Sequence, residues 1–236
     1  MKKLIAFDLD GTLTQHKTPL DSEHREMLDR LRRAGYTLLV VGAGQCARIY
    51  QQMGCYPIDI IGNYGMQRSA VREGEFVLLR DECAPCDRSS VEERVAFLRE
   101  KHGFTDFAGE SVEFHPSGCV TFAILGTKAK QEDKLAFDPD RSRRRAIYDE
   151  VVALFPEYVV FVGGSSSFDM APRPFDKYCA LVAYCRENGY AEDEVVFVGD
   201  DYGRGGNDEA VLLGGIDFVK IDDYRETPAR LAFLLK

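Results

Sequence analysis

The stretch Phe7-Asp8-Leu9-Asp10-Gly11-Thr12 joins an apolar run to two acidic residues. The run Leu4-Ile5-Ala6-Phe7 predicts a strand buried on both faces, because a half-buried strand would alternate apolar and polar residues. In an open parallel sheet, ligands bind at the carboxyl ends of the strands. We therefore expect Asp8 and Asp10 to face a crevice, with a turn at Gly11 that lets the second carboxylate reach over the first.

The flanking parts of the chain repeat this strand-loop-helix rhythm. The strands are expected at 4–7, 37–41, 58–61, 195–198 and 218–221, and the helices at 22–34, 47–53, 178–188, 208–213 and from 227 onward. Such alternation predicts an α/β fold with a parallel sheet covered by helices on both faces.

The middle of the chain has a different pattern. We expect helices at 90–101, opened by the capping box Ser90-x-x-Glu93, and at 143–155, with strands at 112–114, 120–125, 158–162 and 167–171. Two helices with an antiparallel sheet predict a compact α+β unit. The predicted domains are a core formed by 1–81 and 173–236 and an inserted domain at 82–172.

Composition excludes several classes of protein. With 236 residues, 45% of them hydrophobic, the chain is long enough for one core and a smaller second one. The net charge of −9 argues against a nucleic-acid partner, and no apolar run is long enough to span a membrane. We expect a cytoplasmic protein whose seven cysteines are reduced.

Two local patterns are expected to be structural. Cys83-Ala84-Pro85-Cys86 has the spacing of a redox or zinc pair but lacks a second Cys/His pair, so a loop between the domains is the favoured reading. The basic run Arg141–Arg145 could bind a phosphate or nucleic acid, but it is expected to be the solvated face of a helix.

A second buried strand also ends in acids. Gly199-Asp200-Asp201 follows the run Val196–Val198, and Asn207-Asp208 follows shortly after. Oxygen ligands that converge from separate strand ends suit Mg²⁺. Lys177, at the start of a predicted helix, could place its charge against a phosphate, although a solvated lysine is the commoner outcome.

Together these segments resemble the haloacid dehalogenase superfamily of phosphotransferases, and within it the eukaryotic-type phosphomannomutases. Asp8-x-Asp10-Gly11-Thr12 matches the first motif of the superfamily, Lys177 the third, and Gly199-Asp200 with Asn207-Asp208 the fourth. The resemblance implies a Rossmann-like core with an inserted cap of the C2B type, and a homodimer formed through that cap.

The resemblance also implies a mechanism. Asp8 would be the nucleophile that forms an aspartyl-phosphate, and Asp10 the general acid and base. Asp8, the Asp10 carbonyl and Asp200 would hold Mg²⁺, with Asp208 behind them, and Lys177 would neutralise phosphoryl charge.

Two departures from the family bear on the substrate. The second motif, Gly42-Ala43-Gly44-Gln45, lacks the usual hydroxyl, so main-chain N–H groups and the Gln45 side chain would have to bind the phosphate. The cap positions that carry phosphate-gripping arginines in the mutases align with His115, Thr127 and Lys134. Two other cap residues, Ser167 and Asp169, match positions that contact the substrate.

These departures set the order of three hypotheses. Without bidentate arginines, a bisphosphorylated intermediate would be bound more weakly. This favours a phosphatase for a small phosphorylated metabolite, such as a sugar phosphate. The alternative is a phosphomannomutase-like mutase. A non-catalytic binding protein on the same fold is the third reading, and the intact set of Asp8, Asp10, Lys177 and Asp200 argues against it.

Overall fold

The computed structural model describes residues 1–235, which form two compact units. Unit 1 contains Met1–Glu82, Asp176–Gly203 and residues 208–235, and unit 2 contains Cys83–Phe175 and Arg204–Asn207. The short return of the chain to unit 2 at Arg204–Asn207 was not expected from the sequence. Among the described residues, no helix is both long and apolar enough to cross a membrane.

Unit 1 is built on a seven-stranded sheet in the order β11-β10-β1-β2-β3-β4-β5. Its strands are β1 (Leu4–Phe7), β2 (Thr37–Val41), β3 (Asp59–Gly62), β4 (Gln67–Arg72), β5 (Glu75–Asp81), β10 (Val195–Gly199) and β11 (Asp217–Lys220). The five strands from β11 to β3 run parallel, and β4 and β5 add an antiparallel hairpin at one edge. The predicted parallel α/β sheet is confirmed.

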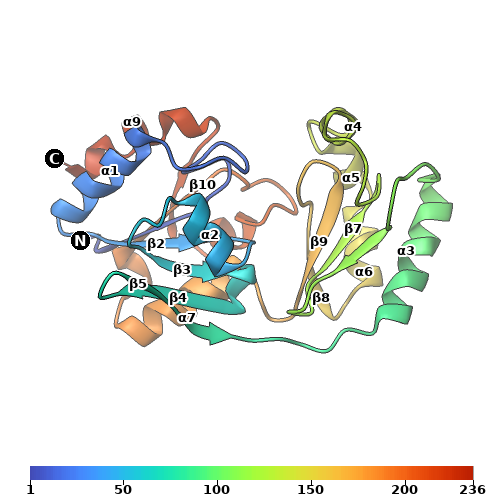
Figure 1. Cartoon of the computed structure of the whole chain (residues 1–236), viewed down its shortest axis with the longest axis horizontal. Helices are drawn as coiled ribbons and strands as arrows, with labels where there is room; N and C mark the ends of the chain where they lie inside the picture. The colour runs from blue at the N-terminus through green and yellow to red at the C-terminus, as the bar shows by residue number, and fades with distance from the viewer. Residues whose placement is uncertain (236) are drawn as a thin grey trace. The chain divides into compact units, whose positions relative to one another are not determined.

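The two faces of this sheet carry two separate cores because successive side chains of a strand point to opposite faces. Ile5 and Phe7 pack with helices α1 (Ser22–Arg33) and α2 (Cys46–Gln52) and with Leu231, which follows α9 (Thr227–Arg230). Leu4 and Ala6 pack with α7 (Lys177–Asn188) and α8 (Glu209–Leu213). Within unit 1, Figure 1 shows α1 and α9 on one side of the sheet and α7 on the other. Short 3₁₀ turns lie at η1 (Asn63–Gly65), η2 (Glu192–Glu194), η3 (Tyr224–Glu226) and η4 (Ala232–Leu235).

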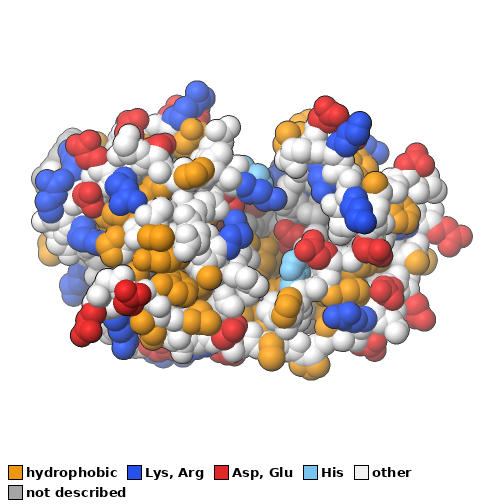
Figure 2. Space-filling view, in the orientation of Figure 1, with side chains coloured by type: hydrophobic (Ala, Val, Ile, Leu, Met, Phe, Trp, Pro, Cys, Tyr) orange, Lys and Arg blue, Asp and Glu red, His pale blue; other side chains and the backbone are white. Residues whose placement is uncertain are grey.

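Unit 2 is built on an antiparallel sheet in the order β6-β7-β9-β8. The strands are β6 (Val112–Phe114), β7 (Val120–Ala123), β8 (Tyr158–Phe161) and β9 (Ser167–Pro172), and the helices are α3 (Arg88–His102), α4 (Gln131–Phe137), α5 (Ser142–Ala146) and α6 (Tyr148–Leu154). Apolar side chains of α3 and α6 share one core with one face of the sheet. In Figure 2, acidic and basic side chains are interspersed over the visible face of this unit.

Three local predictions for unit 2 were wrong. The helix expected at 143–155 is interrupted at Ile147, where α5 ends and α6 begins. Helix α4 was not foreseen, because it buries none of its side chains and so carries no apolar stripe. The N-cap of α3 is Asp87, whose carboxylate accepts the Ser90 N–H, rather than Ser90 itself.

The basic run Arg141–Arg145 is also not wholly a solvated face. The Arg144 side chain is 1% exposed and forms an ion pair of 2.8 Å with the buried carboxylate of Asp138. Its guanidinium also donates to the carbonyl oxygens of Gly163 and Ser167, the latter at 3.0 Å. Burial alone would raise the pKa of Asp138, but the hydrogen bonds from Arg144 and from main-chain N–H groups hold this pKa below its ordinary value. Arg144 therefore ties the start of α5 to the loop before β9.

We expect Arg144→Met to destabilise the protein strongly, by about 3–5 kcal/mol, because it leaves a buried carboxylate without its partner. The measurement is the free energy of unfolding in urea. The neighbouring exposed Arg143→Met is the matched control, with an expected cost below about 1 kcal/mol. Equal losses for the two variants would show that the buried pair does not stabilise unit 2.

Candidate active site

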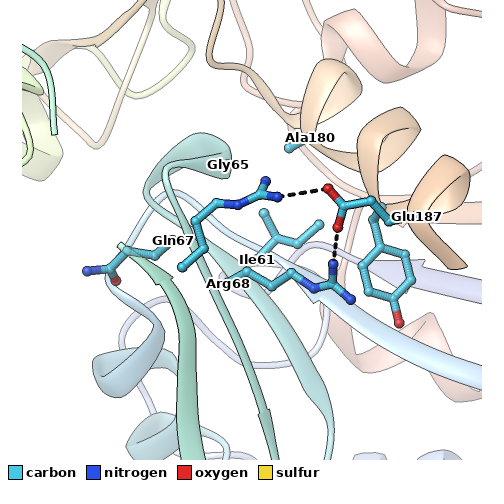
Figure 3. Close-up of a pocket in the computed structure, with 8 residues that line it drawn as sticks. Ile61, Gly65, Gln67, Arg68, Ala180 and Glu187 are labelled. Atoms are coloured by element: carbon cyan, nitrogen blue, oxygen red, sulfur yellow. Dashed lines mark hydrogen bonds and ion pairs between the residues drawn. The ribbon is translucent and has the colours of Figure 1, made fainter. Parts of the chain in front are cut away.

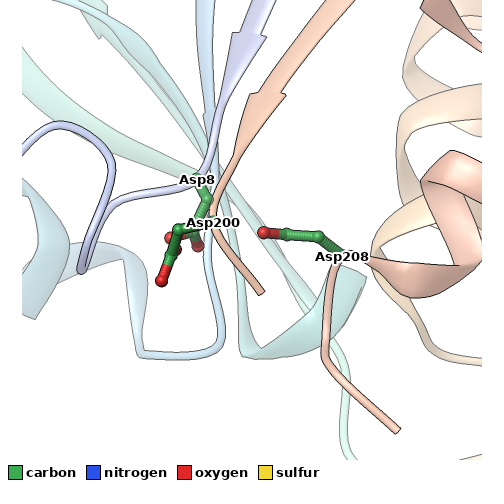
Figure 4. Close-up of side chains that lie close together, drawn as sticks. All are labelled: Asp8, Asp200 and Asp208. Carbon is green, nitrogen blue, oxygen red and sulfur yellow. The ribbon is translucent and has the colours of Figure 1, made fainter. Parts of the chain in front are cut away.

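Three carboxylates from separate segments of unit 1 meet at the carboxyl ends of β1 and β10. Oxygen atoms of Asp8, Asp200 and Asp208 all lie within 4.8 Å of one another (Figure 4). The Asp8 N–H donates to the Val198 carbonyl at 2.9 Å, so the parallel pairing of β1 with β10 continues to the first acid. The predicted convergence of acids at neighbouring strand ends is therefore present.

Lys177 lies among these acids with a side chain that is 0% exposed. Its ammonium group donates to Asp208 Oδ1 at 2.7 Å and to Asp8 Oδ1. Lys177 is the first residue of α7, and the N-cap Asp176 accepts the Cys179 N–H at 2.7 Å, which fixes where the helix begins. The alternative of a solvated lysine is wrong.

Asp208 supports the site through both of its oxygens. Oδ1 accepts the Lys177 ammonium, and Oδ2 accepts the Asp201 N–H at 3.1 Å. A Cβ on Gly199 would lie 2.4 Å from Asp208 Oδ2, so only glycine leaves room for this carboxylate. Asp208 thus holds both the ammonium group and the loop after β10.

Asp200 is held close to the main chain that follows β1. Thr12 Oγ1 donates to Asp200 Oδ1 at 3.2 Å. Gly11 has a φ of +96°, and a Cβ there would lie 2.4 Å from Asp200 Oδ2. The glycine therefore provides both the turn that the sequence predicted and the space for the Asp200 carboxylate.

Burial and mutual repulsion make these acids hard to ionise. Burial raises the pKa of Asp8 to about 7, and Asp200 adds to the rise while Lys177 opposes it. Burial, reinforced by Asp208, raises the pKa of Asp200 to about 6. Burial also raises the pKa of Asp208 to about 7. Although burial favours a neutral amine, the two carboxylates raise the pKa of Lys177 above its ordinary value, so it stays charged.

Asp10 does not reach over Asp8 in this structure. Its carboxylate is not part of the three-acid cluster. Asp10 Oδ1 instead accepts hydrogen bonds of 2.7 Å from the Lys17 N–H and from Gln52 Nε2, at the end of α2. Sequence reasoning missed Gln52 because it lies 42 positions from Asp10.

The loop Gly42–Gln45 leads from β2 into α2. The Cys46 N–H, at the start of the helix, donates to Gln67 Oε1 at 2.9 Å and is therefore already occupied. The carbonyls of Gly44 and Gly42 accept the N–H groups of Asn63 and Tyr64 at 2.8 and 3.3 Å.

These contacts leave main-chain donors available in the loop. Within residues 1–235, the N–H groups of Ala43, Gly44 and Gln45 have no hydrogen-bond acceptor. The Gln45 side chain is exposed and does not cap α2. The loop therefore offers N–H groups to a ligand, as expected, but not the N–H at the first residue of the helix.

Three of the four predicted substrate residues form one polar cluster in unit 2. Thr121 Oγ1 donates to Asp169 Oδ1 at 3.0 Å and lies 3.3 Å from His115 Nε2. Ser167 Oγ lies 3.4 Å from the same Asp169 oxygen. Burial raises the pKa of Asp169. The fourth residue, Lys134, donates to the Thr127 carbonyl at 3.2 Å instead.

Thr121 was missed by sequence reasoning. It pairs with Asp169 across β7 and β9, and the alternation along β7 places it on the face opposite the apolar core residues Val120 and Phe122. That alternation was readable in the sequence and could have identified Thr121.

A separate small pocket in unit 1 contains none of the predicted site residues. It is lined by Gln67, Arg68, Arg80, Tyr184 and Glu187, among others. Figure 3 shows Glu187 between the two guanidinium groups, and the Arg80–Glu187 ion pair measures 2.8 Å. Since Glu187 pairs with both arginines, their charge is partly neutralised within the protein.

Comparison with known proteins relates this arrangement to a family. The family model of eukaryotic phosphomannomutase matches residues 105–218. The phosphomannomutase of Schizosaccharomyces pombe is 26% identical over 226 residues, covering 90% of this chain and 86% of the relative. The phosphomannomutase of Dendrobium officinale is 27% identical over 252 residues, covering 99% of this chain and 95% of the relative.

Solved structures share the fold at low sequence identity. The IMP-nucleotidase of Plasmodium falciparum superposes with a TM-score of 0.67 at 13% identity, covering 99% of this chain and 70% of the other. A phosphatase of the haloacid dehalogenase superfamily from Bacteroides thetaiotaomicron gives 0.65 at 16% identity, covering 99% and 95%. The chain is therefore similar in sequence to eukaryotic phosphomannomutases and shares its fold with a phosphatase of the haloacid dehalogenase superfamily.

Proposed function

We propose that the chain is a Mg²⁺-dependent enzyme that transfers the phosphoryl group of a small sugar phosphate through Asp8. The observation that carries this proposal is the buried ammonium of Lys177 between Asp8 and Asp208, beside a third acid, Asp200. A lysine and several acids at the ends of parallel strands are suited to hold a phosphoryl group and a divalent cation together.

The donor set fits Mg²⁺. All the candidate ligand atoms are oxygens, and when ionised the three carboxylates exceed the one ammonium by two negative charges. Because Asp208 already uses both oxygens, Asp8 and Asp200 would hold the ion, together with the Asp10 carbonyl. When bound, Mg²⁺ would draw negative charge from the phosphoryl oxygens.

The side chains of this protein would then catalyse two successive phosphoryl transfers. In the first, an Asp8 oxygen forms a bond to phosphorus, the bond to the leaving oxygen breaks, and Asp10 gives that oxygen a proton. In the second, Asp10 takes the proton from an acceptor hydroxyl, whose oxygen attacks phosphorus and releases Asp8. Lys177 and the free N–H groups of Ala43, Gly44 and Gln45 would bind phosphoryl oxygens.

The acceptor distinguishes two candidate activities. The similarity to phosphomannomutases along most of the chain favours a sugar hydroxyl as acceptor, as in a mutase, over the phosphatase that the absence of the mutases' arginines favoured in the sequence analysis. Hydrolysis remains the second candidate because the residues aligned with the arginines of the mutases are His115, Thr127 and Lys134. None of these offers a bidentate fork to a second phosphate.

An assay with mannose 6-phosphate and Mg²⁺ distinguishes the two candidate activities. A mutase converts it to mannose 1-phosphate when a hexose bisphosphate is present, whereas a phosphatase releases inorganic phosphate. In either case we expect Asp8→Asn to lower the rate by more than about 10³-fold, since the amide is a poor nucleophile. The exposed Asp217→Asn is the control, with an unchanged rate. Full turnover by Asp8→Asn would rule out Asp8 as the nucleophile.

Binding of Mg²⁺ should stabilise the protein more at pH 7.5 than at pH 5.5. The pKa values of Asp8, Asp200 and Asp208 are raised to about 7, 6 and 7, so below pH 6 these groups are mostly protonated and hold a cation poorly. At a concentration 100 times Kd, Mg²⁺ adds about 2.7 kcal/mol, a rise in Tm of about 5–10 °C.

The measurement is the Tm with and without Mg²⁺ at the two pH values. Asp200→Asn should abolish the rise at pH 7.5, whereas Asp217→Asn should keep it. A rise in Tm of the same size at both pH values, or one that persists in Asp200→Asn, would contradict a metal site at these acids.

A further inference from the structure

Gln52 is joined to the segment after β1 by three hydrogen bonds. Its side-chain Nε2 donates to Asp10 Oδ1 at 2.7 Å and to Thr14 Oγ1 at 3.0 Å. Its main-chain carbonyl accepts the Leu20 N–H at 2.9 Å. Since Gln52 is the last residue of α2, the end of this helix is fastened to the loop that carries Asp10.

The orientation of the Gln52 amide is set by Arg48, one turn earlier on α2. Arg48 Nη1 donates to Gln52 Oε1 at 2.9 Å. A guanidinium can only donate hydrogen bonds, so the amide oxygen must face Arg48 and the amide nitrogen must face Asp10. The Arg48 guanidinium also packs over Gly44, where a Cβ would lie 2.1 Å from Nη2.

The two oxygens of Asp10 are therefore not equivalent. Oδ1 accepts two hydrogen bonds of 2.7 Å, from Gln52 and from the Lys17 N–H. Within residues 1–235, no hydrogen bond to Asp10 Oδ2 is found. With two donors on one oxygen, rotation of the carboxylate about its last bond is restricted, and Oδ2 keeps a fixed direction.

We infer that Gln52 is a positioning residue for Asp10, with Arg48 fixing the Gln52 amide. Gln52 occupies Oδ1, so that Oδ2 is the oxygen that gives the proton to the leaving oxygen and takes it from the acceptor. This inference rests on the proposed function. In this role Gln52 acts through Asp10, so it affects only those steps in which Asp10 must be aligned.

The dependence of the rate on the leaving group tests this role. 4-Nitrophenyl phosphate and phenyl phosphate share a ring, but the phenoxide that leaves from phenyl phosphate is the stronger base and needs the proton more. The measured quantity is the rate at which 4-nitrophenol or phenol is released. The enzyme is in excess over the ester, so that only the first phosphoryl transfer, to Asp8, is followed. The variants are Gln52→Leu and the control Gln51→Leu, the neighbouring exposed glutamine on the same helix.

We expect Gln52→Leu to slow the reaction of phenyl phosphate by about 10-fold or more and that of 4-nitrophenyl phosphate by less than about 3-fold. Gln51→Leu should leave both rates unchanged, and Arg48→Met should shift the two rates in the same sense as Gln52→Leu, by a smaller factor. Retained activity on 4-nitrophenyl phosphate also shows that the variant site is folded.

Equal losses on the two esters would show that Gln52 has only a structural role, and unchanged rates on both would show that it does not position Asp10. Either result overturns the inference while the proposed function stands. If the wild-type protein releases neither 4-nitrophenol nor phenol, the result counts against the proposed function, and the inference fails with it.

Discussion

The candidate site depends on one buried ammonium group. Lys177 is fully enclosed and contacts carboxylates from two other segments, Asp8 at the end of β1 and Asp208 before α8. Removing such ions from water is costly, and the contacts offset that cost only while all partners remain in place. The ion pairs therefore join three distant parts of the chain into one arrangement. When the three carboxylates are ionised, the single ammonium does not neutralise them all, and Asp200 is the acid that Lys177 does not contact.

Two glycines allow the acids to approach the main chain. A side chain at Gly11 would collide with the Asp200 carboxylate, and one at Gly199 would collide with Asp208. The carboxylates occupy the space where those side chains would lie. The glycines next to the acidic residues in the sequence are thus a requirement of packing, and they explain why the acidic pairs occur beside glycine.

The five parallel strands of unit 1 and the cluster of acids could be predicted because they depend on local pattern, whereas the hairpin of β4 and β5 was not expected. Apolar runs that end in acids mark the carboxyl ends of buried parallel strands, and β1 and β10 are adjacent in the sheet as that pattern requires. The direction of Asp10, the occupied N–H at the start of α2 and the burial of Arg144 could not be predicted. Each depends on a partner, respectively Gln52, Gln67 and Asp138, that only the tertiary fold brings into contact.

The central claim is that Asp8 accepts the phosphoryl group while Lys177 and the acids surround it. The most direct measurement is a crystal structure of the protein with Mg²⁺ and beryllium fluoride, which mimics an aspartyl-phosphate. We expect the beryllium atom bonded to an Asp8 oxygen, the magnesium ion held between Asp8 and Asp200, and the Lys177 ammonium in contact with a fluorine. Beryllium fluoride bound elsewhere, or a metal ion coordinated away from Asp8 and Asp200, would contradict it.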